Sequence, residues 1–266
     1  MPTKTFVSRP VNDASDFNYQ VDIIIPFHGQ YEKVTRLVES IYRCTRSNFF
    51  QLCLVDDCSP NEDYLVNVAA NIAKTSTARG ITNNFKSIRM PEQVGFAGAL
   101  KKGFDETESP FVCFVNSDCV LEDGGWLRAL GETLLNLKEQ GVRMVSPMTN
   151  NPVGGDPAQK GDRSEYSLDH VVLEEGAHLS MYCVLCHRQL FARCGGFLKE
   201  YPYGYYEDEE FARRMQRFGF KQAVCRNSWV QHDGMSTIGS LWKRDPSIKN
   251  VMEEENRERC IVDMKS

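Results

Sequence analysis

The chain of 266 residues is 41% hydrophobic and 25% charged, which suits one large domain or two closely joined halves. Its net charge of −5 and the lack of any run of Lys or Arg argue against a nucleic-acid partner. The apolar runs are only strand-length, and residues 1–20 lack an apolar signal core. We therefore expect a cytoplasmic protein without a membrane span.

Strands and helices alternate in the first part of the chain. Apolar runs predict strands, and apolar residues at helical spacing, such as Val34, Leu37 and Ile41, predict helices. This order indicates βαβ units, and hence an α/β protein with a mostly parallel sheet covered on both faces. The strands are expected at 21–26, 49–55, 86–90, 111–116 and 142–146, and the helices at 31–46, 61–74, 95–104 and 122–138.

The second part of the chain departs from this alternation. Residues 147–173 are rich in Gly, Pro, Asn and Asp, which predicts a long loop. The polar tail after Lys243 is expected to form one helix, 247–264, or to be partly disordered. Between them we expect strands at 179–186, 220–225 and 229–231, and helices at 188–194 and 207–219.

Ten cysteines raise the question of disulfides or a zinc site. Cys183 and Cys186 form a C-x-x-C pair, but residues three apart on a strand face opposite sides, so the two thiols should diverge. No second C-x-x-C completes a site, and most other cysteines lie in or beside apolar strands. We expect buried, reduced thiols, with a redox role left open.

Four consecutive carboxylates, Glu207 to Glu210, follow an aromatic run in the second half of the chain. They fit the first turn of an ordinary solvated helix, whose dipole favours acids there. They also fit a site that needs a base or a cation. Arg213 and Arg214 are expected to pair with Glu209 and Glu210 at i,i+4 spacing.

Further candidate groups follow predicted strands. Asp57 and Asp118 stand at strand ends and His232 follows a later strand, although turn chemistry or a surface histidine would explain each one alone. Because strand ends gather at one edge of a parallel sheet, we expect these groups near one cleft. Asp118 and His232 can hold a divalent cation on a nucleoside diphosphate, and mixed oxygen and nitrogen ligands suit Mn2+ better than Ca2+. Asp57 can accept hydrogen bonds from a base or ribose, and Asp208 can act as general base.

Seven motifs, in order, resemble those of inverting family 2 glycosyltransferases with the GT-A fold, over about residues 21–236. They are VDIIIPF at 21–27, VDDCS at 55–59, VGFAGA at 94–99, FVNSD at 114–118, GGF at 195–197, YEDEEFARR at 206–214 and VQH at 230–232. The patterns at 94–97 and 206–208 are most similar to the rhamnosyltransferase-like subgroup. The resemblance implies a Rossmann-like central sheet flanked by helices, with a small acceptor-side sheet.

The resemblance also divides the chain and assigns roles. Residues 1–20 would be an N-terminal arm, 21–120 the nucleotide-sugar-binding half, 121–236 the acceptor-binding and catalytic half of the same domain, and 237–266 a C-terminal tail. Asp118 and His232 would bind Mn2+ or Mg2+. Asp208 would be the catalytic base, with Glu207 supporting it or contacting the acceptor. The nucleotide would contact Pro26, Phe27, Asp57, Gly95, Phe96, Ala97, Asn116 and Ser117.

Three positions depart from the family pattern. Asn116 replaces the first acid of the D-x-D element, and Cys58 stands where glycine is usual. Met181-Tyr182-Cys183 replaces the small glycines that usually precede the acceptor-side strand. These changes leave one carboxylate in the D-x-D element and predict an acceptor pocket of unusual shape.

The resemblance implies a metal-dependent glycosyltransferase of the hexosyltransferase type, acting in polysaccharide biosynthesis. It would move a sugar from a UDP, dTDP or GDP donor to a hydroxyl of a glycan or glycolipid, with inversion. A sugar nucleotidyltransferase is an alternative, although residues 27–30 have too few glycines and no cation to hold a triphosphate. The second alternative is a non-catalytic nucleotide-sugar-binding relative. Its only support is Asn116, which replaces the first acid of the D-x-D element. Transient membrane contact and a homodimer through the tail also stay open.

Overall fold

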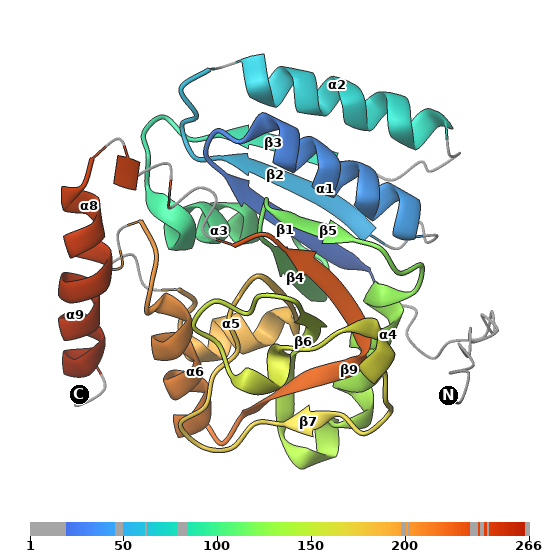
Figure 1. Cartoon of the computed structure of the whole chain (residues 1–266), viewed down its shortest axis with the longest axis vertical. Coiled ribbons are helices and arrows are strands. Elements are labelled where there is room, and N and C mark those ends of the chain that lie inside the picture. Colours follow the sequence, from blue (N-terminus) through green and yellow to red (C-terminus); the bar gives the residue numbers. More distant parts are fainter. Residues whose placement is uncertain are drawn as a thin grey trace, which may run out of the picture.

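The structure is a computed structural model that describes residues 20–45, 50–61, 63–78, 85–197, 201, 203–234, 239, 242–243 and 245–263. The described strands form one sheet in the order β3-β2-β1-β4-β8-β6-β9-β5, with β7 paired to β9 (Figure 1). The strands are β1 (Val21–Phe27), β2 (Phe50–Asp56), β3 (Phe85–Arg89), β4 (Phe111–Val115), β5 (Cys119–Leu121), β6 (Val142–Thr149), β7 (Val171–Val172), β8 (Cys183–His187) and β9 (Lys221–His232). The helices are α1 (Tyr31–Cys44), α2 (Asp63–Ala78), α3 (Gly95–Asp105), α4 (Trp126–Asn136), α5 (Arg188–Cys194), α6 (Glu207–Arg217), α8 (Ser247–Asn250) and α9 (Asn256–Asp263).

Four parallel strands make up the first half of the sheet. β1 pairs with β2 on one side and with β4 on the other, and β2 pairs with β3. Every residue of β1 and β4 is buried, which explains why both are continuous apolar runs rather than alternating ones. Their carboxyl ends therefore meet at one edge, as predicted from the sequence.

The second half of the sheet is mixed. β8 runs antiparallel to β4 and β6, and β9 runs parallel to β6. The 12-residue strand β9 pairs with β7 near its start and with β5 at its end. The strands expected on the acceptor side are thus joined to the large sheet through β9. The predicted α/β class, a central sheet flanked by helices, is confirmed.

Helices cover both faces of this sheet (Figure 1). α1, α2 and α4 pack over one apolar core that contains Ile23 of β1, whereas α3, α5 and α6 pack over a second that contains Ile24. Cys183 and Cys186 lie in opposite cores, so their predicted divergence is confirmed. All ten cysteines are free and nine are buried. Within the described residues, no helix is both long and apolar enough to cross a bilayer.

Some predicted elements differ from those observed. α2 spans Asp63–Ala78 rather than 61–74, and the strands predicted at 220–225 and 229–231 are one strand, β9. The predicted loop 147–173 contains the end of β6, two short 3-10 turns and β7. β5 was not predicted, because three residues show no usable periodicity.

The two ends of the chain are described in part. The tail is helical from residue 247 to 263, with a π-helical turn, η4 (Val251–Glu255), between α8 and α9. Residues 1–19 of the predicted N-terminal arm lie outside the described residues. So do residues 235–238, at the predicted boundary between the catalytic half and the tail.

A buried ion pair closes the edge of the sheet opposite the strand ends. The Asp22 carboxylate accepts hydrogen bonds from the Ser109 backbone N–H and hydroxyl, both at 2.7 Å. It also accepts one from the Arg188 guanidinium at 2.8 Å, and the Asp22 side chain is only 1% exposed. Such a charge is stable only because each of its partners is present.

We expect Asp22→Asn to lower the free energy of unfolding by about 3–5 kcal/mol, because it leaves the Arg188 charge without its carboxylate. Asp105→Asn is the matched control, since the Asp105 and Lys101 side chains are 51% and 41% exposed. It should leave stability almost unchanged. Urea denaturation of both variants tests this, and similar losses in the two would contradict it.

Candidate functional site

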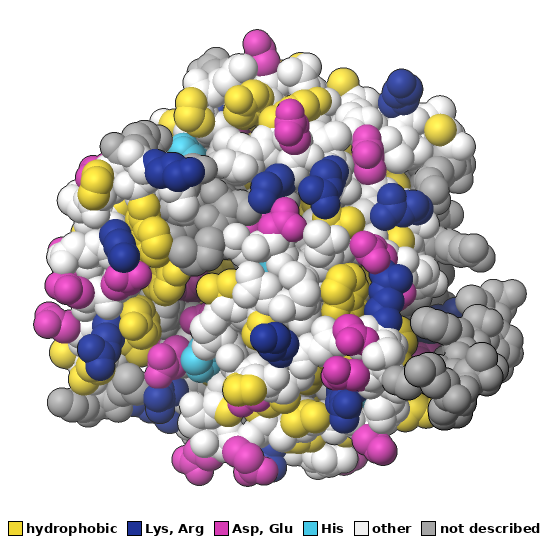
Figure 2. Space-filling view, viewed as in Figure 1, with side chains coloured by type: hydrophobic (Ala, Val, Ile, Leu, Met, Phe, Trp, Pro, Cys, Tyr) yellow, Lys and Arg dark blue, Asp and Glu magenta, His cyan; other side chains and the backbone are white. Residues whose placement is uncertain are grey.

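A cavity of about 400 Å3 opens where β1, β2 and β4 end. Figure 2 shows the surface hollowed beside the C-terminal helices, with acidic and basic side chains interspersed over this face. Every residue predicted for the site lines the cavity except Ala97. Ala97 lies on the inner side of α3, where it is buried in the core against the sheet. The fold therefore brings the remaining predicted residues together.

Asp57 lies at the base of the cavity, directly after β2. Its two carboxylate oxygens accept hydrogen bonds from the backbone N–H groups of Val94 and Gly95, at 2.7 and 2.9 Å. Burial raises the pKa of Asp57, and these two hydrogen bonds oppose that rise. Each oxygen keeps a second lone pair with which it can accept a hydrogen bond from a ligand. Asp57 thus both caps α3 and faces the cavity.

Two backbone positions beside Asp57 adopt left-handed conformations. Gly95 has φ 78°, and a Cβ atom there would lie 2.7 Å from the backbone nitrogen of Tyr203, so only glycine allows this approach. The Gly95 backbone thus lies against the Tyr203 backbone, and Gly95 also lines the cavity. Cys58 has φ 56°, which explains why glycine is usual at its position.

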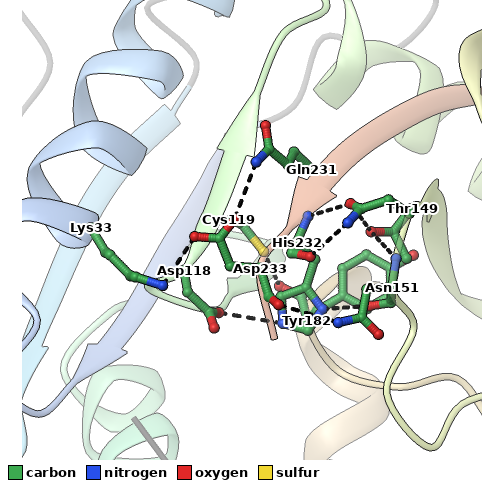
Figure 3. A network of polar contacts seen from close by, with 10 residues as sticks. Lys33, Asp118, Cys119, Thr149, Asn151, Tyr182, Gln231, His232 and Asp233 are labelled. Carbon is green, nitrogen blue, oxygen red and sulfur yellow. Dashed lines mark hydrogen bonds and ion pairs between the residues drawn. The ribbon is translucent and has the colours of Figure 1, made fainter. Parts of the chain in front are cut away.

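Asp118 and His232 are brought together by the pairing of β5 with β9 (Figure 3). In this register Cys119 lies opposite His232, so Asp118 lies beside the imidazole, with 3.3 Å between His232 Nε2 and Asp118 Oδ1. His232 Nδ1 lies 2.7 Å from the Asn151 carbonyl oxygen. A carbonyl only accepts, so Nδ1 carries a proton and Nε2 faces the carboxylate. A proton or a metal ion at Nε2 makes that contact attractive.

The loop after β6 holds the imidazole in place. The Asn150 side chain accepts a hydrogen bond from the His232 backbone N–H at 2.8 Å and donates one to the His232 carbonyl at 3.0 Å. The Tyr182 ring stacks on the imidazole with 5.1 Å between centroids. Asn150 and Asn151 were missed in the sequence; Asn151 contacts the imidazole through its backbone carbonyl, which no side-chain pattern reveals.

A third potential ligand lies beside this pair. One ligand atom each from Asp118, Cys119 and His232 lie within 4.8 Å of one another. The Cys119 thiol, however, donates to the Tyr182 carbonyl at 3.3 Å. Burial, and then the charge of Asp118, raise its pKa well above the ordinary value, so the thiol stays protonated. The donor set is therefore one carboxylate and one imidazole, which fits Mn2+ or Mg2+ better than a thiolate-bound zinc.

Two carboxyl groups at the start of α6 line another part of the cavity. Burial, and then the charge of Asp208, raise the pKa of Glu207 to about 8. Glu207 Oε2 is buried and has no hydrogen-bond partner among the described residues. Burial also raises the pKa of Asp208, whereas the nearby charge of His178 opposes the rise. The two acids thus differ in environment although they are adjacent in sequence.

The other two acids of the run pair with arginines as predicted, although Glu210 is buried rather than solvated. Glu209 accepts a hydrogen bond from Arg213 at 2.7 Å, and Glu210 one from Arg214 at 2.5 Å. Both are i,i+4 pairs on α6, so this prediction is confirmed. Several residues of the cavity wall were not predicted as site residues, among them the polar residues His28, Gln93, His178 and Ser180.

Met181 and Tyr182 occupy the positions where the family pattern has small glycines. Met181 lines the cavity, and Tyr182 lies under His232. Both are buried, so each fills space that a glycine would leave open. The structure therefore shows a bulkier wall next to the Asp118–His232 pair.

Residues 22–195 match the family model described as Glycosyl transferase family 2. A search of curated protein sequences finds no match.

Solved structures share the fold. GalNAc-T7 with UDP, GalNAc and Mn2+ superposes with a TM-score of 0.62 at 17% identity, over 82% of this chain and 44% of that one. The mannosyltransferase PcManGT from Pyrobaculum calidifontis, with GDP-Man and Mn2+, superposes with a TM-score of 0.61 at 14% identity. The superposition covers 89% of this chain and 64% of that one. S. aureus TarS 1-349 with UDP-GlcNAc superposes with a TM-score of 0.57 at 15% identity, over 83% of this chain and 61% of that one. The chain spans less than two thirds of each of these proteins.

The raised pKa of Glu207 predicts a pH-dependent effect of Glu207→Gln. Between the ordinary value near 4.5 and about 8, the native carboxyl keeps a proton that the unfolded chain releases. The wild type therefore loses stability as pH rises through this window, whereas Gln does not titrate. As pH rises through this window, the free energy of unfolding of Glu207→Gln should therefore increase relative to that of the wild type. The expected increase is on the order of 1.4 kcal/mol per unit of pKa shift.

Urea denaturation at pH 5, 6.5 and 8 measures this difference. Glu255→Gln, at an exposed position of η4, is the control and should show no such trend. A difference between wild type and Glu207→Gln that stays constant with pH would contradict the assignment.

Proposed function

We propose that this chain, which belongs to glycosyl transferase family 2, transfers a sugar from a nucleoside diphosphate donor to a hydroxyl of a glycan or glycolipid, with inversion. One observation carries the proposal: the Asp118–His232 pair and the Glu207–Asp208 pair line the same cavity at the strand ends. The first pair suits a metal-bound diphosphate and the second suits proton transfer. An enzyme of this kind needs both at one place.

The donor would lie along the strand-end side of the cavity. Pro26, Phe27 and Phe96 offer apolar surface to a base, and Asp57 offers the remaining lone pairs of its carboxylate. Asn116 and Ser117 precede the proposed metal ligand Asp118 in the chain. The similar folds were solved with UDP, UDP-GlcNAc or GDP-Man, which supports a UDP or GDP donor here, whereas a dTDP donor rests on the sequence resemblance alone.

Asp118 Oδ1 and His232 Nε2 would hold the divalent cation. Asn150 and Asn151 would keep the imidazole oriented for it. When bound, the ion supplies charge neutralisation for the departing diphosphate. A cation is needed here because the carboxylates that line the cavity would otherwise repel an anionic donor.

Asp208 would take the proton of the attacking hydroxyl as the general base. With a pKa of about 8, Glu207 keeps its proton at neutral pH and leaves Asp208 as the ionised member of the pair. The protonated Glu207 can donate a hydrogen bond to the acceptor. His178 would favour the ionised form of Asp208.

The nucleotidyltransferase alternative gains no support from the loop after β1. The Gly29 N–H donates to the Ser59 hydroxyl at 2.7 Å, and Lys33 pairs with Asp233 at 3.0 Å. These groups are therefore engaged within the protein rather than arranged around a triphosphate. The hexosyl donor, the rhamnosyltransferase-like subgroup, a role in polysaccharide biosynthesis and the cytoplasmic location stay predictions from the sequence.

We expect Asp208→Asn to lower kcat by about 100- to 10,000-fold, because the amide cannot accept the proton. Binding of UDP or GDP with Mn2+ should stay near the wild-type value, since Asp208 does not hold the nucleotide. Asp169→Asn is the matched control at an exposed position outside the cavity. Turnover and calorimetric titration test this, and near-normal turnover of Asp208→Asn would exclude it as the base.

We expect Asp118→Asn and His232→Ala each to raise the dissociation constant for Mn2+ by at least about tenfold. Binding of UDP and GDP should weaken in parallel, and removal of the metal with EDTA should weaken it in the wild type. Titration calorimetry with and without Mn2+ measures the Mn2+ affinity of the variants, their nucleotide affinity and the nucleotide affinity of the metal-free wild type. If both variants bind Mn2+ like the Asp169→Asn control, the metal site lies elsewhere.

A further inference from the structure

A strained turn carries the two catalytic candidates into the cavity. Tyr203, Gly204, Tyr205 and Tyr206 precede α6 and have φ values of 66°, 115°, 70° and 70°. Left-handed conformations cost roughly 1–2 kcal/mol for a residue with a side chain. A run of them persists only where the surrounding structure holds it. The turn ends at Tyr206, directly before Glu207, so its shape decides where α6 begins.

The C-terminal segment, α8 to α9, supplies a buried contact to this turn. Asn256 Nδ2 donates to the Gly204 carbonyl oxygen at 2.8 Å, and Asn256 is fully buried. Buried amides are retained where they hold a specific partner, because an unmatched polar group is costly there. The bond joins residues that are 52 positions apart in the sequence.

Apolar contacts join the same two parts of the chain. Ile248 and Met252 of the C-terminal segment are buried against Tyr203, Tyr205 and Trp242. The rings of Tyr205 and Trp242 stack, with centroids 6.4 Å apart. Figure 1 shows α8 and α9 alongside α6, so the contacts extend beyond the turn.

These contacts converge on the carboxyl group of Glu207. A Cβ placed on Gly204 would lie 4.0 Å from Glu207 Oε1, 4.0 Å from the Met252 methyl carbon and 3.7 Å from Phe96 Cβ. Glu207, Met252 and Phe96 therefore surround the residue whose carbonyl Asn256 holds. Gly204, whose carbonyl oxygen Asn256 holds, lies only three residues before Glu207.

We propose that Asn256 is a positioning residue for the reaction. Through its hydrogen bond to Gly204 it clamps the left-handed Tyr203–Tyr206 turn, and so sets the position of Glu207 and Asp208. The inference rests on the proposed function for its effect on catalysis, whereas the clamp itself is a property of the fold. It gives the C-terminal tail a role that the sequence did not suggest.

Asn256→Asp in the full-length protein tests the clamp, because it keeps the shape of the side chain but replaces the donor with a carboxylate. Asn250→Asp is the matched control, since Asn250 is exposed on the same segment. Hydrogen exchange followed by mass spectrometry should show peptides over 203–211 exchanging about tenfold faster in Asn256→Asp than in wild type. Peptides over 111–116 should be unchanged. Asn256→Ala replaces Asn256→Asp if the latter does not fold.

The same variants test positioning. With UDP- or GDP-sugar and Mn2+, Asn256→Asp should lower kcat by about tenfold and leave Mn2+ affinity unchanged, because β5 and β9 hold the metal ligands. Exchange at 203–211 equal to that of Asn250→Asp would overturn the clamp. Faster exchange with wild-type kcat would overturn positioning. If the wild type itself transfers no sugar, the proposed function fails, and the exchange rates still decide on the clamp.

Discussion

β9 leaves the core of the sheet and, over its last three residues, runs antiparallel to β5. This short pairing places the imidazole of His232 next to the carboxylate of Asp118, although the two residues are far apart in the sequence. His232 donates hydrogen bonds from its backbone N–H to Asn150 and from Nδ1 to the Asn151 carbonyl, and these leave the imidazole one orientation. The Asp118–His232 contact depends on this register, because a shift by one residue would turn His232 to the other face of the sheet.

The opposite wall of the cavity follows a different principle. Glu207 and Asp208 begin a helix whose dipole favours their charges, yet burial raises the pKa of both. The raised pKa keeps a proton on Glu207 at neutral pH, and Asp208 is the general base in the proposed reaction. The left-handed turn before α6 is held by Gly95 on one side and by Asn256 on the other. The turn is therefore held by the start of α3 and by the C-terminal segment.

Much of this arrangement could be predicted from the sequence, because strand-end acids gather at one edge of a parallel sheet. Asp57, Asp118, His232 and Asp208 do line one cavity. β5 could not be predicted, since three residues carry no periodicity, although it sets the Asp118–His232 contact. The conformations of Gly95 and the Tyr203–Tyr206 turn depend on long-range packing, which local propensity does not encode. For the same reason Ala97 falls in the core and Asn256 had no visible role.

One cavity is proposed to bind a metal-bound nucleoside diphosphate beside the Glu207–Asp208 pair. The most direct measurement is anomalous diffraction from crystals grown with Mn2+ and UDP or GDP. We predict an anomalous peak within bonding distance of Asp118 Oδ1 and His232 Nε2, with the diphosphate on it and the base near Phe27 and Asp57. A peak at another place, or a nucleotide bound outside this cavity, would contradict the account.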